Sequence, residues 1–165
     1  MKALVDKFSK WDTRRLALAR FVAGWSKDPK AQVGAVITDN LGRVIALGYN
    51  GFAVGIEDSE GRLNGKEKLD MILHAEENAV LIAGERGRGG TIYVFGKPTC
   101  AHCASVIIQS GLKRIVSPNP DDESWIGLSS GYLQSTSLSR LVSTLNSTMR
   151  VTKASGPTFF IDSGR

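Results

Sequence analysis

Hydrophobic positions in the first part of the chain predict a helix followed by two strands. Large apolar side chains recur at helical spacing within residues 13–25 and share one face that we expect to be buried: Leu18, Phe21, Val22 and Trp25. Asp12 precedes this run and is a suitable helix N-cap. The apolar and β-branched runs 32–38 and 43–49 are joined by a turn that contains Asp, Asn and Gly. They predict a pair of antiparallel strands.

The middle of the chain alternates between polar and apolar stretches. Residues 50–70 are rich in Gly, Asp, Glu and Lys, which predicts a long loop of functional character. Apolar patterns then predict a helix over 73–83, a strand over 91–95, a helix over 100–110 and a strand over 113–117. This order of elements predicts an α/β domain in which helices cover a central sheet.

The last third of the chain carries a weaker pattern. Apolar residues keep helical spacing within 138–149, which predicts a helix, while Phe159, Phe160 and Ile161 predict a last strand or a tail that docks on a neighbour. The chain of 165 residues has the size of one domain and shows no repeat or interdomain linker. We therefore expect a single domain over residues 1–165.

Composition and charge narrow the class of protein. With 42% hydrophobic and 22% charged residues, the chain resembles a soluble globular protein and not a disordered one. The net charge of +5 favours anionic partners such as phosphates, but the basic residues are scattered, so we expect no nucleic-acid partner. No apolar run has the length of a membrane span or a signal peptide, which predicts a cytoplasmic location without membrane contact.

Two cysteines, Cys100 and Cys103, have the spacing C-x-x-C. A disulfide between them would close a tiny loop, so the spacing is typical of metal ligands or of a redox dithiol. With His74 they supply the three ligands of a catalytic zinc site, which keeps a fourth position for water. The chain between His74 and Cys100 is long enough for the rest of a helix, a turn and a strand. The helices that begin at these residues can therefore converge on one metal.

Glu76 lies two residues after His74, close enough to reach that water without binding the metal. A carboxylate there can take a proton and pass it to a leaving amine, the relay that hydrolytic deamination needs. The signature of zinc deaminases is H-x-E followed by P-C-x-x-C, and this chain has both motifs with Thr99 directly before the first Cys. Either motif alone also occurs by chance, in structural zinc sites or in redox pairs, so their joint occurrence carries the prediction. A three-ligand site leaves His102 a supporting or surface role.

Several segments around these motifs resemble the deoxycytidylate (dCMP) deaminase family, within the cytidine/deoxycytidylate deaminase superfamily. They are residues 26–29 (SKDP), 32–37 (QVGAVI), 48–51 (GYNG), 68–70 (KLD), 74–79 (HAEENA) and 107–113 (IIQSGLK). The resemblance covers about residues 14–117, and residues 118–165 diverge from the family. Thr99 also departs from the pattern, because the family usually has a Pro directly before its first Cys.

The resemblance implies a three-layer cytidine-deaminase-like α/β fold, with a central mixed sheet of about five strands flanked by helices. It implies zinc (Zn2+) held by His74, Cys100 and Cys103, with Glu76 as the catalytic proton shuttle. The implied reaction is the hydrolytic deamination of dCMP to dUMP and ammonia, in pyrimidine deoxynucleotide metabolism.

The resemblance also implies binding residues. It places Asn50 and Ala75 against the nucleotide, and Ser26 and Lys27 near its phosphate. An Asn side chain supplies both donors and an acceptor, and a Lys side chain supplies a mobile positive charge. A turn-forming Asn50 and a solvated Lys27 are the alternatives.

Members of the family form homo-oligomers, often hexamers, so the resemblance implies a hexamer or a dimer here. Many members are switched by dCTP and dTTP near the Gly-Tyr-Asn-Gly loop. This makes Tyr49 and Gly51 candidates for an allosteric nucleotide loop.

Two other functions stay open. The same metal site serves deaminases of other cytosine or adenine substrates, such as dCTP, a nucleoside or a tRNA adenosine. A non-catalytic, zinc-stabilised regulatory module would need the three ligands but no carboxylate beside the water. The presence of Glu76 therefore favours an enzyme.

Overall fold

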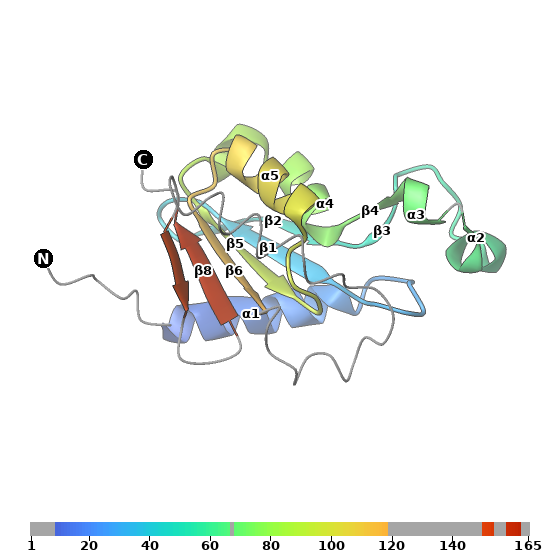
Figure 1. Cartoon of the computed structure of the whole chain (residues 1–165), viewed down its shortest axis with the longest axis horizontal. Helices are drawn as coiled ribbons and strands as arrows, with labels where there is room; N and C mark the ends of the chain where they lie inside the picture. Colours follow the sequence, from blue (N-terminus) through green and yellow to red (C-terminus); the bar gives the residue numbers. More distant parts are fainter. Residues whose placement is uncertain (1–8, 67, 119–149, 154–157, 163–165) are drawn as a thin grey trace, which may run out of the picture.

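A mixed sheet forms the centre of the structure, a computed structural model that describes residues 9–66, 68–118, 150–153 and 158–162 (Figure 1). Six strands build this sheet in the described residues: β1 (Gly34–Thr38), β2 (Val44–Tyr49), β5 (Thr91–Phe95), β6 (Arg114–Pro118), β7 (Arg150–Lys153) and β8 (Thr158–Asp162). Their spatial order is β2-β1-β5-β6-β8-β7. The β5–β6 pair is parallel, and the neighbouring pairs on either side are antiparallel.

The α/β fold class is confirmed, and the strand count differs from the expected five. Four strands come from the chain up to Pro118, and β8 and β7 extend the sheet beyond them. The apolar run Phe159–Ile161 lies in β8, so the strand predicted there is present. The helix predicted over 138–149 lies outside the described residues.

Helices cover both faces of the sheet (Figure 1). Helix α1 (Lys10–Ala23) lies on one face, while α4 (Ala75–Ala83) and α5 (Ala101–Gln109) lie together on the other. Every residue of β1 is buried, because alternate side chains enter a core on each face: Ala35 and Ile37 face α4, and Val36 faces α1. A short 3-10 helix (Gly84–Gly87) follows α4.

Helix α1 differs in two details from the sequence prediction. Its N-cap is Ser9 and not Asp12: the Ser9 hydroxyl accepts from the Asp12 N–H at 3.2 Å, and the Asp12 carboxylate accepts from the Ser9 N–H at 2.7 Å. This reciprocal pair is a capping box, in which the acidic residue takes the third helical position. Asp12 is therefore buried inside the first turn.

Two aromatic residues predicted on the buried face, Phe21 in α1 and Trp25 just beyond its end, are exposed instead. Phe21 is 67% exposed and Trp25 is 47% exposed. The helix instead approaches β1 through small side chains, since a Cβ atom added to Gly34 would lie 2.1 Å from the Ala19 carbonyl oxygen. Ala19 and Ala23 occupy this close contact, which leaves no room for large rings.

The segment predicted as a loop contains short elements that project from the sheet as an arm, defined as residues 51–66 and 68–73 (Figure 1). Strands β3 (Gly51–Phe52) and β4 (Ile72–Leu73) pair at its base, and α2 (Glu60–Asn64) and α3 (Lys68–Met71) lie beyond them. Helices this short bury too little to show an apolar period in the sequence. A buried ion pair of 2.7 Å between Lys68 and Asp28 attaches the arm to the domain.

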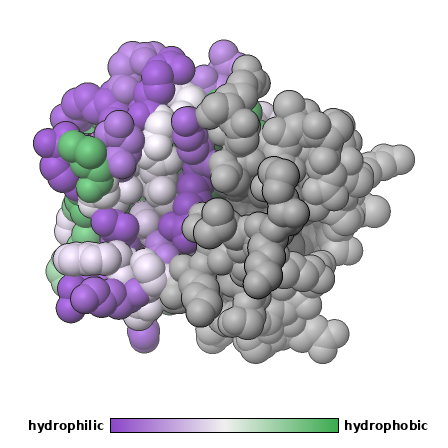
Figure 2. Space-filling view, turned by 90° about the vertical axis from the view of Figure 1, so that its left-hand side faces the viewer, coloured by the Kyte–Doolittle hydropathy of each residue, from purple (hydrophilic) through white to green (hydrophobic). Residues whose placement is uncertain are grey.

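The described surface is mostly polar on the face shown in Figure 2, where apolar residues form small separate groups. None of the helices in the described residues combines the length and the apolar character that a membrane crossing requires.

Candidate metal centre

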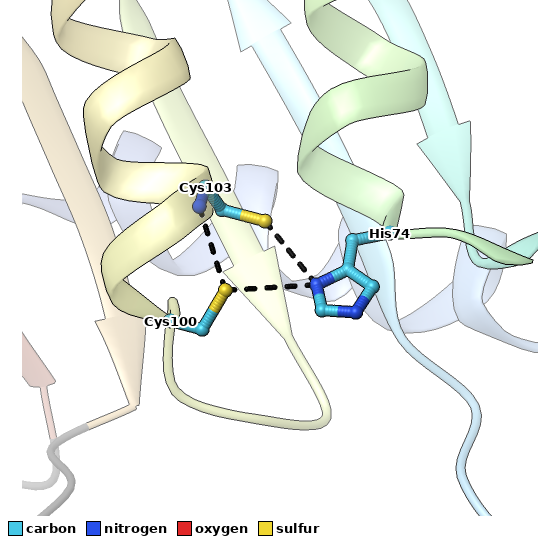
Figure 3. A group of neighbouring side chains, drawn as sticks. All are labelled: His74, Cys100 and Cys103. Atoms are coloured by element: carbon cyan, nitrogen blue, oxygen red, sulfur yellow. Dashed lines mark hydrogen bonds between the residues drawn. The ribbon is translucent and has the colours of Figure 1, made fainter. Parts of the chain in front are cut away.

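Three side chains of metal-ligand type meet where α4 and α5 begin (Figure 3). His74 is the N-cap of α4, Cys100 is the N-cap of α5, and Cys103 lies in the first turn of α5. The His74 Nδ1 atom lies 3.2 Å from the Cys103 sulfur and 3.7 Å from the Cys100 sulfur. All three ligand atoms lie within 4.8 Å of one another. The geometry brings together the residues that the sequence spacing predicts.

The distances and the donor set fit zinc. A tetrahedral zinc ion with ordinary Zn–N and Zn–S bonds separates a nitrogen from a sulfur ligand by about 3.5 Å. The observed N···S distances of 3.2 and 3.7 Å lie on either side of that value. One imidazole and two thiolates form the ligand set of a catalytic zinc site, which keeps one position open.

The protonation of the two cysteines also suits a cation. The hydrogen bond from Cys103 outweighs burial and, with the His74 imidazole, lowers the pKa of Cys100 to about 3. The hydrogen bond to Cys100 and burial raise the pKa of Cys103. Without a metal, the pair therefore carries one proton, on Cys103. A divalent cation would displace this proton and favour the thiolate form of both cysteines. The Cys103 N–H also donates to the Cys100 sulfur at 3.4 Å, a contact that favours its thiolate form.

Glu76 lies in the first turn of α4 and is 4% exposed. Burial raises its pKa to about 7, although its own backbone N–H and the neighbouring His74 act in the opposite direction. A carboxyl group that titrates near neutrality can both accept and return a proton.

Thr99 is a buried residue of the site to which the sequence analysis gave no role. Its N–H and hydroxyl lie 2.9 and 3.2 Å from the Ser117 hydroxyl oxygen, and its side chain also hydrogen-bonds Glu76. The signal in the sequence is the departure itself, since Thr99 stands where the family usually has Pro. The hydroxyl links the end of β6 to the carboxyl group of Glu76.

Glu77 and His102 connect the two ligand-bearing helices. One carboxylate oxygen of Glu77 lies 2.9 Å from His102 Nε2, and the other accepts from the His74 backbone N–H at 2.9 Å. The role of Glu77 was not predicted from the sequence, although a Glu three residues after an N-cap is a capping-box signal. In the described residues, the group that could hold a metal contains His74, Cys100 and Cys103 but not His102.

Ser26 and Asn50 are buried, and their polar atoms bind protein partners. The Ser26 hydroxyl donates to the Asn50 carbonyl oxygen at 2.7 Å. The Asn50 amide oxygen accepts from the Val33 N–H at 2.8 Å, and its amide nitrogen donates to Asp28 and to the Ala31 carbonyl. These bonds fix the loop between α1 and β1. A contact of either side chain with a nucleotide stays a prediction.

The other residues expected to bind nucleotides differ in exposure. Lys27 is exposed and forms a 2.9 Å ion pair with Asp58 on the arm. Ala75 is fully buried at the start of α4. Tyr49 is 37% exposed, and its ring packs edge to face on Trp25 with centroids 6.0 Å apart. Gly51 begins β3 and is half-buried.

The sequence of the chain matches a known protein family. Residues 9–118 match the family described as the cytidine and deoxycytidylate deaminase zinc-binding region. The chain belongs to this family. The match contains both ligand-bearing motifs, so the zinc-binding region of the family includes His74, Cys100 and Cys103 of this chain.

Curated relatives support the assignment. The chain is 41% identical over 115 residues to an uncharacterized deaminase in the luxG 3′ region of Aliivibrio fischeri, covering 70% of this chain and 77% of the relative. It is 35% identical over 118 residues to the deoxycytidylate deaminase of Homo sapiens, covering 67% of this chain and 66% of the human protein. Its match therefore spans about two thirds of the length of that relative.

A solved structure shares the fold. The dCMP deaminase from the cyanophage S-TIM5, in apo form, superposes with a TM-score of 0.53 at 23% identity. The superposition covers 70% of this chain and 82% of that chain. The cytidine-deaminase-like architecture expected from the sequence is therefore confirmed.

Proposed function

We propose that this protein is a hydrolase that deaminates dCMP to dUMP and ammonia with the help of zinc. The observation that carries the proposal is the convergence of His74, Cys100 and Cys103 beside the buried carboxyl group of Glu76. The choice of substrate is supported by relatives named deoxycytidylate deaminase, such as those of Pongo abelii and Homo sapiens at 36% and 35% identity.

The ligand residues bind the metal, and Glu76 transfers the proton. His74, Cys100 and Cys103 would hold the zinc ion, which supplies a Lewis acid that activates water for attack on the pyrimidine ring. The pKa of about 7 leaves the Glu76 carboxyl group in both protonation states near neutral pH, and its carboxylate form can take up a proton. It therefore accepts the proton that water loses and gives it to the amino group, which leaves as ammonia. The net change is dCMP plus water to dUMP plus ammonia.

The groups around Glu76 keep this relay in place. Burial removes the carboxyl group from bulk water, so it exchanges its proton with the reacting water and the substrate instead of with bulk solvent. Thr99 holds the same carboxyl group by a hydrogen bond. Ala75 is buried, so its contact with the pyrimidine would be made by its backbone at the first turn of α4.

The phosphate of the substrate would lie near Lys27. Its ammonium group is exposed and already binds an anion, the Asp58 carboxylate, which a phosphate could replace. Ser26 and Asn50 would support this site by fixing the loop that carries Lys27, since their side chains bind protein partners.

The proposal includes the wider expectations from the family resemblance. The chain would form one domain over residues 1–165, act in the cytoplasm as a hexamer or dimer, and respond to dCTP or dTTP near Tyr49 and Gly51. Pairing of β8 with β6 supports the single domain. The exposed Tyr49 ring, packed on Trp25 at the end of β2, offers a surface on which a nucleotide base could stack.

An absorbance assay tests the proposed substrate. Zinc-loaded protein is mixed with dCMP and, separately, with dCTP, deoxycytidine and a tRNA, while loss of the cytosine band and release of ammonia are recorded. We expect rapid turnover of dCMP. Turnover of another substrate alone would contradict the substrate assignment, and bound zinc without turnover of any of them would favour a regulatory module.

A further inference from the structure

The contact between α4 and α5 next to the metal ligands contains a polar bridge that the deamination chemistry does not use. Both oxygens of Glu77 take part: Oε1 lies 2.9 Å from His102 Nε2, and Oε2 accepts from the His74 backbone N–H at 2.9 Å. His102 stands between the two cysteines in the sequence. The bridge therefore joins the segment that carries both thiols to the residue that carries the imidazole.

The backbone of His74 depends on this bridge. His74 has extended torsion angles, φ −71° and ψ 154°, because it precedes the first helical residue. Its N–H lies outside the helical hydrogen-bond pattern, and the Glu77 carboxylate is its acceptor. Since the peptide orientation of a residue sets the direction of its side chain, the carboxylate helps to aim Nδ1 at the two sulfur atoms.

His102 acts on the other end of the same carboxylate. Its side chain is 74% exposed, whereas that of Glu77 is 19% exposed. Glu77 therefore lies mostly between the two helices, and His102 covers it on the solvent side. An N–H at His102 Nε2 donates to Glu77 and limits the orientations of the carboxylate. The same hydrogen bond therefore restrains the rotation of the Glu77 side chain and the distance between the first turns of α4 and α5.

We propose that Glu77 and His102 are positioning residues that hold His74 at the correct distance from Cys100 and Cys103 and thereby retain zinc. The inference rests on the proposed zinc site and adds the reason why the site keeps its metal. Groups that orient metal ligands from outside the ligand set commonly change metal affinity by about 10- to 100-fold when they are removed.

Zinc retention in three variants tests the bridge. His102→Ala removes the donor, and His102→Gln replaces it with an amide N–H of similar reach. The matched control is Gln109→Ala, because Gln109 is exposed on the same helix at the end far from the ligands. Purified zinc-loaded proteins are mixed with the chromogenic chelator 4-(2-pyridylazo)resorcinol, and the rate and equilibrium of zinc transfer are recorded. We expect His102→Ala to bind zinc about tenfold more weakly, and His102→Gln and the control to resemble the wild type.

Two further readouts separate positioning from a general structural role. The absorption bands of the Co2+-substituted protein report ligand geometry, and we expect them to shift in His102→Ala and to return in His102→Gln. The urea midpoint of the zinc-free protein reports folding, and we expect it to be the same in all variants. Loss of zinc affinity together with an equal loss of zinc-free stability would contradict the proposal.

The outcomes also separate this inference from the proposed function. Wild-type protein that binds no zinc would contradict the proposed function itself. Wild-type protein that binds one zinc per chain, with His102→Ala retaining it equally well, would overturn the bridge and leave the deaminase proposal intact.

Discussion

Two carboxyl groups are buried on opposite faces of the sheet, and their pKa values are shifted in opposite directions. Asp12, in α1, is 2% exposed, and Glu76, in α4, is 4% exposed. Burial raises the pKa of both groups. At Asp12 the hydrogen bonds from Arg114 and Ser9 outweigh burial and lower the pKa to about 2. At Glu76 burial prevails, and the pKa rises to about 7.

The partners explain the difference. Asp12 accepts from Arg114 at 2.7 and 3.2 Å and from the Tyr93 hydroxyl at 3.0 Å, so it is held as a carboxylate that joins α1 to β5 and β6. In the part of the chain that the structure describes, no Arg or Lys forms an ion pair with Glu76, and the carboxyl group can change its protonation at neutral pH. Two carboxyl groups with similarly small exposed areas thus differ in role: Asp12 is a structural residue on one face, and Glu76, which lies deeper, is suited to proton transfer on the other.

The largest expected effect is on turnover after Glu76→Gln. The amide keeps the shape of the side chain but cannot carry the proton, so we expect kcat for dCMP to fall by about 1,000-fold or more. Zinc content and the urea midpoint should stay near those of the wild type. A variant that keeps most of its turnover would show that the two buried carboxyl groups do not differ in function.

For Asp12→Asn we expect a loss of stability with unchanged turnover. Loss of the carboxylate breaks the buried ion pair between Asp12 and Arg114, and we expect the free energy of unfolding to fall by about 3 kcal/mol. Tyr93→Phe is the matched control, because it removes one hydrogen bond to the same carboxylate and keeps the ion pair, at a cost of about 1 kcal/mol. Urea unfolding measures both values. Turnover per folded molecule should not change in either variant.

Acid should weaken the wild type more than Asp12→Asn. The folded pKa of Asp12, about 2, lies below the ordinary value of 3.8 for an aspartate. The ionised group therefore contributes stability above about pH 4, and this contribution, about 2 kcal/mol, is lost as the pH falls through about 2. The stability difference between the two proteins, measured by urea unfolding from pH 5 to pH 2, should shrink. A difference that stays constant would contradict the assigned pKa.

The smallest effect concerns the exposed edge of the proposed substrate site. Lys27→Ala should raise KM for dCMP about fivefold and leave kcat unchanged, because it removes one mobile charge from the phosphate. KM for deoxycytidine should not change. Lys30→Ala is the matched control, since Lys30 is an exposed lysine on the same loop. Equal effects of the two substitutions would indicate a general charge effect instead of phosphate binding.

The parts of the molecule that could be predicted are those with local signals. His74, Cys100 and Cys103 were predicted from donor types and spacing, and the structure brings them together. The strands and helices with a clear apolar period were also found. The exposure of Trp25 was not predicted. The buried side of α1 depends on the close approach of Ala19 to Gly34, and Gly34 lies in another element.

The remaining residues depend on contacts that the sequence order hides. Asn50 binds Val33, Asp28 and Ala31, which are 17 to 22 positions away. Asp12 was expected to be a cap and instead binds Arg114, 102 positions away. Such long-range polar contacts have no period or local motif, so only the folded arrangement reveals them.

Zinc removal and return on one protein sample tests the central claim most directly. The metal is removed with a chelator, its absence is verified by elemental analysis, and ammonia release from dCMP is followed while Zn2+ is added back. The account predicts no turnover without zinc and full turnover at one equivalent per chain. Turnover that persists without zinc, or its absence in fully reloaded protein, would contradict the account.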